Sequence, residues 1–356
     1  MEPTERPEHG EGGKYVTPGQ EFVRDSRYIQ TRITRDGGLP DGGYDSATDT
    51  FPVQPGRYRL IAAKACPWAN RAIIVRRLLG LDDAISLGLP GPTHDARSWT
   101  FDLDPGGVDP VLGIHWLQDA YFKRQPNYPR GITVPAIVDT ETGAVVTNDF
   151  AQITLDFSDE WAGFHRPGAP LLLPTDPAER AEMDALMQWI FTEINNGVYR
   201  CGFAGSQEAY EAAHNRLFTA LDKLESRLAE RRFLMGDYIT EADVRLFTTL
   251  VRFDPVYYSH FKTNRNQLRD FPNLWGYARD LYQLPGFGET IDFDQIKQHY
   301  YIVQKDINPT GIVPVGPDLS GWQAPSGRER LTANNPLAPW GLTRTGQPAT
   351  APLPIP

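Results

Sequence analysis

Cysteine is scarce in this chain of 356 residues, with only Cys66 and Cys201 present. Two cysteines are too few for the disulfide framework of a secreted domain, and their spacing does not match a zinc site. A single disulfide between the two is an alternative that the sequence leaves open. We expect reduced thiols in a cytoplasmic protein that holds no metal.

Long apolar runs and an excess of positive charge are also missing. The longest apolar runs, such as residues 136–138 and 171–173, are far shorter than the roughly 20 residues that span a bilayer. Residues 1–13 are polar, which does not suit a targeting sequence. The formal net charge is -10, which argues against a nucleic-acid partner recognised through its phosphates. We therefore expect neither a membrane nor a nucleic-acid partner.

The residues that are present suit two packed domains, since 40% of them are hydrophobic. Residues 1–54 are rich in Gly, Pro and charge and predict an irregular arm. Strand and helix patterns alternate over residues 55–164, which predicts an α/β domain. Amphipathic patterns over residues 175–315 predict an all-helical domain, and residues 316–356 predict an extended, Pro-rich tail.

Local patterns place the main elements of both domains. In the first domain they predict strands at 57–65 and 84–89, helices at 67–81, 115–122 and 150–161, and a β-hairpin that turns at 140–143. In the second they predict long helices at 176–199 and 207–231. Thr240 followed three residues later by Asp243 is a capping box, which predicts the start of a buried helix. Asp243 is therefore interpreted as a helix cap and not as a catalytic acid.

Cys66 is the residue with the clearest chemistry. It precedes Pro67, and because proline is favoured at the first helical position, Cys66 is expected at the N-cap. Unpaired amides and the helix dipole should lower the thiol pKa below its ordinary value of about 8.5, which makes a nucleophile. The alternative is that Cys66 is simply a small buried apolar residue.

No second cysteine lies near enough in the sequence to resolve a disulfide on Cys66. A dithiol motif would need cysteine three residues later, where the chain has Ala69. A mixed disulfide on Cys66 must then be cleared by an external small thiol, which implies a thiol co-substrate. Cys201 lies in the other predicted domain, and a packing role is expected for it.

The dipeptide Val134-Pro135 stands at the head of the predicted hairpin. A cis bond there would turn the Val134 amide and carbonyl outward, toward a peptide-like ligand. Most X-Pro bonds are trans, so this expectation depends on the family resemblance that follows.

Several segments together resemble the xi class of glutathione transferases, which are the glutathionyl-hydroquinone reductases. They are CPWA followed by NRAIIVRRL, then TVPAIVD, NNGVYRCGFA, TEADVRLFTTLVRFDPVYYSHFK, HYY and INPTGIVPVGP. The resemblance extends from about Phe22 to Leu331. It implies a thioredoxin-like N-terminal domain, an all-α helical-bundle C-terminal domain, and a homodimer.

The resemblance also implies an activity. Members of this class remove a thiol substituent from quinols: the cysteine thiolate attacks the thioether sulfur, the ring leaves as a hydroquinone, and a second thiol clears the mixed disulfide. Cys66 then corresponds to the nucleophile, and glutathione or a related thiol to the co-substrate. The other matching positions are Trp99, Val134, Pro135 and Asp149 on the thiol, Tyr199 and Tyr300 as catalytic residues facing the quinol, and Tyr257 and His260 in the same pocket.

At three places the sequence departs from this family. The family has Glu-Ser after the hairpin, where this chain has Asp149-Phe150. Replacing a hydroxyl that bonds the γ-glutamyl carboxylate with a ring should weaken glutathione binding by about 1 to 3 kcal/mol. Asn70 replaces a common histidine, and Val303-Gln304 replaces Ser-His. We therefore consider another low-molecular-weight thiol, with mycothiol as one candidate.

Two other functions compete with this interpretation. One is a non-catalytic binding protein on a transferase scaffold, which the presence of Cys66 and both tyrosines argues against. The other is a conjugating transferase, in which Tyr or Ser normally occupies the critical position. Cys66 does not suit that chemistry.

Overall fold

The computed structural model describes residues 15–95, 97–332 and 334–337. The chain forms two compact units. The first, called the α/β unit here, comprises Ser26–His165 together with Asp292–Lys305. The second, the helical unit, comprises Tyr15–Asp25, Arg166–Ile291 and the described residues from Asp306 onward.

A four-stranded mixed sheet forms the centre of the α/β unit, in the order β4-β3-β7-β8. Its central strand β3 (Tyr58–Ile61) is buried throughout and runs parallel to β4 (Ile85–Gly88). On its other side β3 pairs antiparallel with β7 (Ala136–Asp139), which continues through the predicted hairpin into β8 (Val145–Thr147). The hairpin prediction is therefore confirmed.

Three helices cover this sheet. Helix α1 (Pro67–Leu79) and helix α3 (Phe150–Asp159) pack side by side, and α2 (Gln118–Arg124) lies on the opposite side of the sheet. Every residue of α1 except Arg77 is buried, so this helix lies within the core and does not have the single apolar face that its pattern suggested. Gly80 adopts the left-handed conformation that ends the helix.

Two buried ion pairs hold the start of the central strand. The Arg57 guanidinium bonds both oxygens of Asp139, at 2.9 and 3.1 Å, and so joins the start of β3 to the end of β7. Arg59 donates to Asp109 Oδ2 at 2.9 and 2.8 Å. A buried charge is tolerated only with such a partner, so removing either carboxylate would take away the main countercharge of a buried guanidinium.

The α/β unit also contains short pieces that the sequence analysis did not find. Strands β1 (Arg32–Thr34) and β2 (Thr50–Pro52) form a parallel pair within the arm expected to be irregular over residues 1–54. Strands β5 (His94–Asp95) and β6 (Ser98–Trp99) form an antiparallel pair. Helix α10 (Phe293–Gln298) and the π-helical turn His299–Val303 also belong to this unit, although residues 175–315 were expected to form the helical domain.

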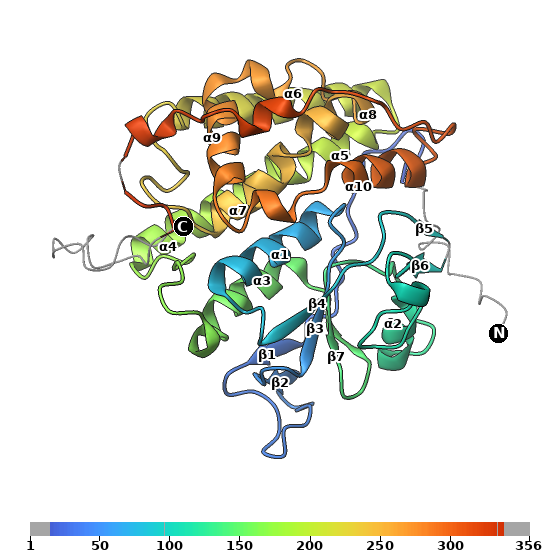
Figure 1. Ribbon diagram of the computed structural model, residues 1–356. Coiled ribbons are helices and arrows are strands. Elements are labelled where there is room, and N and C mark those ends of the chain that lie inside the picture. Colours follow the sequence, from blue (N-terminus) through green and yellow to red (C-terminus); the bar gives the residue numbers. More distant parts are fainter. Residues whose placement is uncertain (1–14, 96, 333, 338–356) are drawn as a thin grey trace. The chain divides into compact units, whose positions relative to one another are not determined.

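The helical unit confirms the all-α prediction (Figure 1). The helix expected over 176–199 divides at a π-helical turn, Phe191–Asn195. The helices are α4 (Pro177–Ile190), α5 (Gly197–Gly202), α6 (Gln207–Arg227), α7 (Glu241–Leu250), α8 (Tyr258–His260) and α9 (Pro272–Gln283). A further π-helical turn, Phe253–Tyr257, precedes α8.

The predicted capping box begins α7. Asp243 accepts a hydrogen bond from the Thr240 amide at 2.7 Å, as the motif requires. It also accepts from the Leu234 amide at 2.9 Å and the Tyr277 hydroxyl at 2.8 Å. The interpretation of Asp243 as a structural cap is therefore confirmed.

The N-terminal segment Tyr15–Asp25, called the strap here, belongs to the helical unit and packs against the rest of it. The Gly19 amide donates to the Gly205 carbonyl at 2.8 Å, and the Gly205 amide donates to Gln20 O at 2.9 Å. The Tyr15 ring stacks on Phe203 with a centroid separation of 4.6 Å. A segment expected to be irregular is thus anchored at several points.

No helix in the described part of the chain is both long enough and apolar enough to cross a membrane.

Candidate active site

Cys66 is the N-cap residue of α1, as predicted, with Pro67 at the first helical position. Its backbone is extended (φ -82°, ψ 123°) and its carbonyl accepts from the Asn70 amide at 2.9 Å. The side chain is 8% exposed and makes no capping hydrogen bond to the first turn. Instead, the thiol donates to the Val134 carbonyl, with Sγ 3.5 Å from the oxygen.

This contact differs from the expectation that the sulfur faces the helix amides. The physical reason is the protonation state: a thiol is a donor and takes an acceptor, whereas a thiolate needs donors.

Val134 and Pro135 lie beside this thiol, at the head of β7. The bond between them is cis. Neighbouring contacts hold the segment, because the Thr133 carbonyl accepts from the Tyr121 hydroxyl at 2.8 Å and the Thr133 hydroxyl accepts from Asn148 Nδ2 at 2.9 Å. The structure thus brings together two of the elements predicted for the site, the cysteine and the Val134 backbone.

Trp99 forms a separate aromatic group in the α/β unit. It lies on β6, and its ring stacks on the His299 imidazole with centroids 4.9 Å apart and planes 17° apart. His94 contacts both, at 5.1 Å from Trp99 and 5.7 Å from His299. His299 Nδ1 is 2.9 Å from the Pro92 carbonyl, so this nitrogen carries a proton that it donates there.

Tyr300 follows His299 in the π-helical turn and is 1% exposed. Its ring contacts His299 edge-on, with centroids 5.5 Å apart. Trp99, His299 and Tyr300 therefore form one contiguous group. Gln304 and Val303, two of the departures from the family pattern, are also buried at the end of this turn.

Asp149 and Phe150 begin helix α3. Asp149 is its N-cap and accepts from the Ala151 amide at 3.2 Å, which is a structural use of the carboxylate predicted to hold the thiol. Phe150 is 5% exposed and packs on Trp68 (4.6 Å) and Tyr28 (5.3 Å). The Arg71 guanidinium lies over the same Trp68 ring at 4.6 Å. An aromatic cluster therefore surrounds this position, where the resemblance led us to expect serine.

The remaining predicted site residues lie in the helical unit and form their own cluster around Phe261. Centroid distances to the Phe261 ring are 5.2 Å from Tyr199, 5.3 Å from Tyr257 and 5.4 Å from His260. Tyr199 and Tyr257 also contact each other at 6.1 Å. All three are buried. The predicted residues are thus divided between the two units, with Cys66, Trp99, Val134, Pro135, Asp149 and Tyr300 in the α/β unit.

Cys201 lies on α5 and is 2% exposed. Burial raises the pKa of its thiol to about 12, so it stays protonated and unreactive near neutral pH. No disulfide joins it to Cys66. This fits the packing role expected for Cys201.

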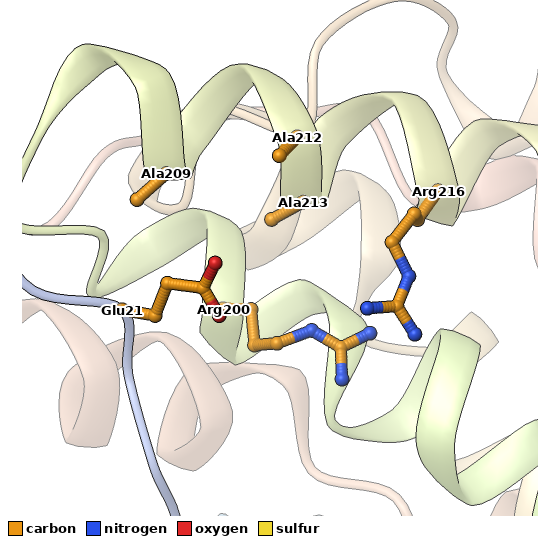
Figure 2. Close-up of a pocket in the computed structure, with 6 residues that line it drawn as sticks. All are labelled: Glu21, Arg200, Ala209, Ala212, Ala213 and Arg216. Atoms are coloured by element: carbon orange, nitrogen blue, oxygen red, sulfur yellow. The ribbon is translucent and has the colours of Figure 1, made fainter.

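A small cavity that is partly open to solvent lies elsewhere in the helical unit (Figure 2). Glu21 from the strap, Arg200 from α5 and Arg216 from α6 line it, together with three alanines of α6. Arg216 is paired with Glu193 at 2.6 Å, and Arg200 lies 4.0 Å from the same carboxylate. The arginines thus belong to a structural charge network, and the cavity is smaller than usual ligand pockets.

Sequence reasoning missed three residues that contact the predicted ones. They are His94 and His299 beside Trp99, and Arg24 of the strap, whose guanidinium lies 4.6 Å from the centre of the Tyr199 ring. His299 could have been found, because it is the first residue of the HYY motif that contains Tyr300. Arg24 carried no local signal, because it is 172 residues from the helix residue that it bonds.

Comparison with known proteins places this arrangement in a family. Residues 65–159 match the glutathione S-transferase N-terminal domain and residues 207–280 match its C-terminal domain. A glutathionyl-hydroquinone reductase of Escherichia coli, YqjG, is 40% identical over 316 residues, which cover 87% of this chain and 93% of that protein. The Xi glutathione transferase of Phanerochaete chrysosporium has 38% identity and a TM-score of 0.77, with 86% and 95% of the two chains covered.

The chain belongs to the Xi class of glutathione transferases. The chain is also similar to a glutathione transferase of Gordonia bronchialis, with 62% sequence identity and a TM-score of 0.82. That match covers 92% of this chain and all of the other. The family and fold predicted from the sequence are confirmed, and the chain is a transferase-like thiol enzyme.

Proposed function

We propose that this Xi-class enzyme removes a low-molecular-weight thiol from thiol-conjugated hydroquinones through a mixed disulfide on Cys66. The main support for this reaction is the position of Cys66 at the N-cap of α1, with Sγ 3.5 Å from the Val134 carbonyl oxygen. Further support comes from the relative in Escherichia coli, which is named for this reaction and whose structure was solved with glutathione bound.

The reaction balances with a second thiol as the reductant. Cys66 Sγ bonds to the thioether sulfur of the conjugate, and the bond between that sulfur and the ring carbon breaks. The electron pair passes to the ring, which takes up a proton and leaves as the hydroquinone. A free thiol then attacks the mixed disulfide, releasing a small disulfide and restoring Cys66, so one conjugate and one thiol give one hydroquinone and one disulfide.

Tyr199 and Tyr300 supply proton donation and charge stabilisation in this proposal. The departing ring gathers negative charge on its oxygens, and a phenolic hydroxyl can donate a hydrogen bond or a proton to it. Both tyrosines are buried, at 7% and 1% exposed, and hydrogen bonds are stronger where water is excluded.

The thiol is glutathione or a related compound, and the packing around Phe150 favours a related compound. Phe150 offers no hydroxyl to a γ-glutamyl carboxylate, and the rings of Trp68 and Tyr28 lie against it. Asp149 accepts from the first turn of α3 through Oδ1, and its side chain is one carbon shorter than the glutamate of the family pattern, so it reaches less far toward an α-amino group. We propose mycothiol as the thiol co-substrate.

Mass spectrometry tests the chemistry. After exposure to a thiol-conjugated quinol, the protein should carry the mass of one thiol on Cys66, and Cys66→Ser should carry none. Cys201 should stay unmodified because burial raises its pKa to about 12. Absence of an adduct, together with no turnover, would reject the enzyme in favour of a non-catalytic binding protein on the same scaffold.

Turnover of one quinol conjugated to glutathione or to mycothiol tests the choice of thiol. We expect the wild type to prefer mycothiol and Phe150→Ser to regain glutathione turnover, by a factor of about 5 to 150 if the restored hydrogen bond contributes 1 to 3 kcal/mol. Phe164→Ser, at a ring that is 41% exposed, is the control and should leave the preference unchanged. A clear preference of the wild type for glutathione would reject the mycothiol proposal.

A further inference from the structure

The N-terminal strap brings one charged side chain against a residue of the proposed chemistry. The Arg24 guanidinium lies over the Tyr199 ring, with its central carbon 4.6 Å from the ring centre. Its Nε donates to Asn196 Oδ1 at 2.9 Å. Asn196 and Tyr199 are three residues apart where α5 begins, so one helix face supplies both contacts of Arg24.

Aromatic packing fixes this geometry from the strap side. Phe22 lies 5.5 Å from the Arg24 guanidinium and 6.3 Å from the Tyr199 ring, at 28° to it. It also contacts Phe203 at 5.2 Å. The Asp306 carboxylate accepts from the Tyr15 and Val16 amides at 2.6 and 2.9 Å, which anchors the start of the strap.

Docking of the strap depends on Gly205. A Cβ added there would lie 1.9 Å from the Thr17 carbonyl oxygen and 2.9 Å from that of Gln20. Both neighbours are backbone atoms, so they cannot yield by a side-chain rotation. The close approach lets the strap and Gly205 exchange two backbone hydrogen bonds, and those bonds set the position of Arg24.

We infer that Arg24 is a positioning residue for the hydroquinone reaction, which stabilises and orients Tyr199 while that tyrosine donates its proton to the departing ring. A guanidinium is attracted to the face of an aromatic ring, and more strongly as the ring gains negative charge. A tyrosine that gives up its proton gains that charge. Arg24 thus assists the step without touching the substrate, and the inference rests on the proposed function.

The kinetics of Arg24→Met and Arg24→Lys test this inference. We expect Arg24→Met to lower kcat about tenfold with little change in KM, because the lost attraction acts as the charge develops. The loss should be greatest for conjugates of the least acidic quinols, which demand the most proton donation. Arg24→Lys keeps the charge without the planar stack and should recover part of the rate.

Two controls separate this role from a general loss of structure. Arg269→Met removes an exposed arginine whose guanidinium bonds the nearby Gln267 and should leave kcat unchanged. Alkylation of Cys66 by iodoacetamide should proceed at the wild-type rate in every variant. Equal losses for all quinols with no recovery by lysine would show that Arg24 only anchors the strap, and the inference would fall.

Gly205→Ala provides an independent variant, since it displaces the strap without altering Arg24. It should reproduce the kcat loss of Arg24→Met, whereas Gly131→Ala, at a site whose nearest neighbour is 3.8 Å away, should not. An unchanged kcat in Gly205→Ala or in Arg24→Met would overturn the inference about Arg24 but would leave the proposed function standing. A wild type that turns over no thiol–quinol conjugate would overturn the proposed function, and the inference with it.

Discussion

At the residue scale, Asp243 shows how burial and hydrogen bonds together set the pKa of a carboxylate, and through it the stability of the fold. It is fully buried and accepts from two amides and from the hydroxyls of Thr240 and Tyr277. Burial disfavours its charge more than those donors favour it, and its pKa is raised from 3.8 to about 6. Its ionisation therefore opposes folding above that pH.

This carboxylate should give the helical unit a distinct pH dependence. Between pH 3.8 and about 6 the folded state holds a proton on Asp243 that the unfolded state has lost. The free energy of unfolding should therefore fall as pH rises through this window, by about 3 kcal/mol. Urea unfolding of the wild type and Asp243→Asn across the window measures the difference.

The asparagine variant should lack that fall, because its side chain does not titrate. Asp318→Asn, at an exposed carboxylate bonded to Ser320, is the control and should keep it. Parallel pH profiles for the wild type and Asp243→Asn would contradict the prediction.

At several single positions the sequence alone was sufficient to predict the local structure. The Cys-Pro pair, the capping box at Thr240 and the hairpin turn all act through neighbours within four residues, so their patterns predicted their structures. The contact between Arg24 and Tyr199 and the stack of His299 on Trp99 join distant segments. No local pattern carries the contact of Arg24, which is why that residue was missed, whereas His299 stands in the HYY motif and could have been found.

At the scale of elements, α5 approaches its neighbours closely because it ends in glycine. A Cβ at Gly202 would lie 2.1 Å from the Phe261 ring, and this ring is buried against Tyr199, Phe203 and Tyr257. Those rings leave it no free direction in which to move. The helix therefore requires glycine there for packing, although glycine weakens a helix.

Gly202→Ala should destabilise the protein by about 1 to 3 kcal/mol, because overpacking outweighs the better helix propensity of alanine. Thermal and urea unfolding measure the change. Gly163→Ala, where no atom lies within 4 Å of the added Cβ, is the control and should be neutral or slightly stabilising. A Gly202→Ala protein as stable as the wild type would show that Phe261 can repack.

Elements that the sequence missed share a physical cause. Strands β1, β2, β5 and β6 are two or three residues long, too short to show an alternating pattern. The helix predicted over 176–199 was interrupted by a π-helical turn, which no periodicity signals. The longer strands β3 and β7 and the helices α1, α3, α4, α6 and α7 were found because each has enough residues to show its period or a clear start signal. Helix α9 is equally long but was not predicted.

At the scale of the whole molecule, the chain passes repeatedly between its two units. It changes unit after residues 25, 165, 291 and 305. The α/β unit needs Asp292–Lys305, whose His299 stacks on Trp99 and bonds the Pro92 carbonyl. The helical unit needs the strap. The homodimer and the cytoplasmic location inferred from the sequence stay predictions.

Halves divided after His165 should therefore fail to fold alone. Residues 1–165 lack the segment that covers Trp99, and residues 166–356 lack the strap. We expect each half to be recovered mainly unfolded, and coexpression to restore a folded product, as measured by circular dichroism and thermal unfolding. The uncut chain with a protease site inserted after Arg166 is the control and should stay folded after cleavage. A stable, cooperative residue 1–165 fragment would contradict this expectation.

Because the chain passes between its two units several times, the units of two related enzymes cannot be exchanged by a simple recombination. The two family domains, at 65–159 and 207–280, suggest that one genetic crossover could exchange the second half for that of a relative. Such a chimaera would carry the strap of one parent against the α5 of the other, and the His299 of one against the Trp99 of the other. Functional exchange needs three coordinated replacements, so we expect natural Xi enzymes to inherit their two units as one piece.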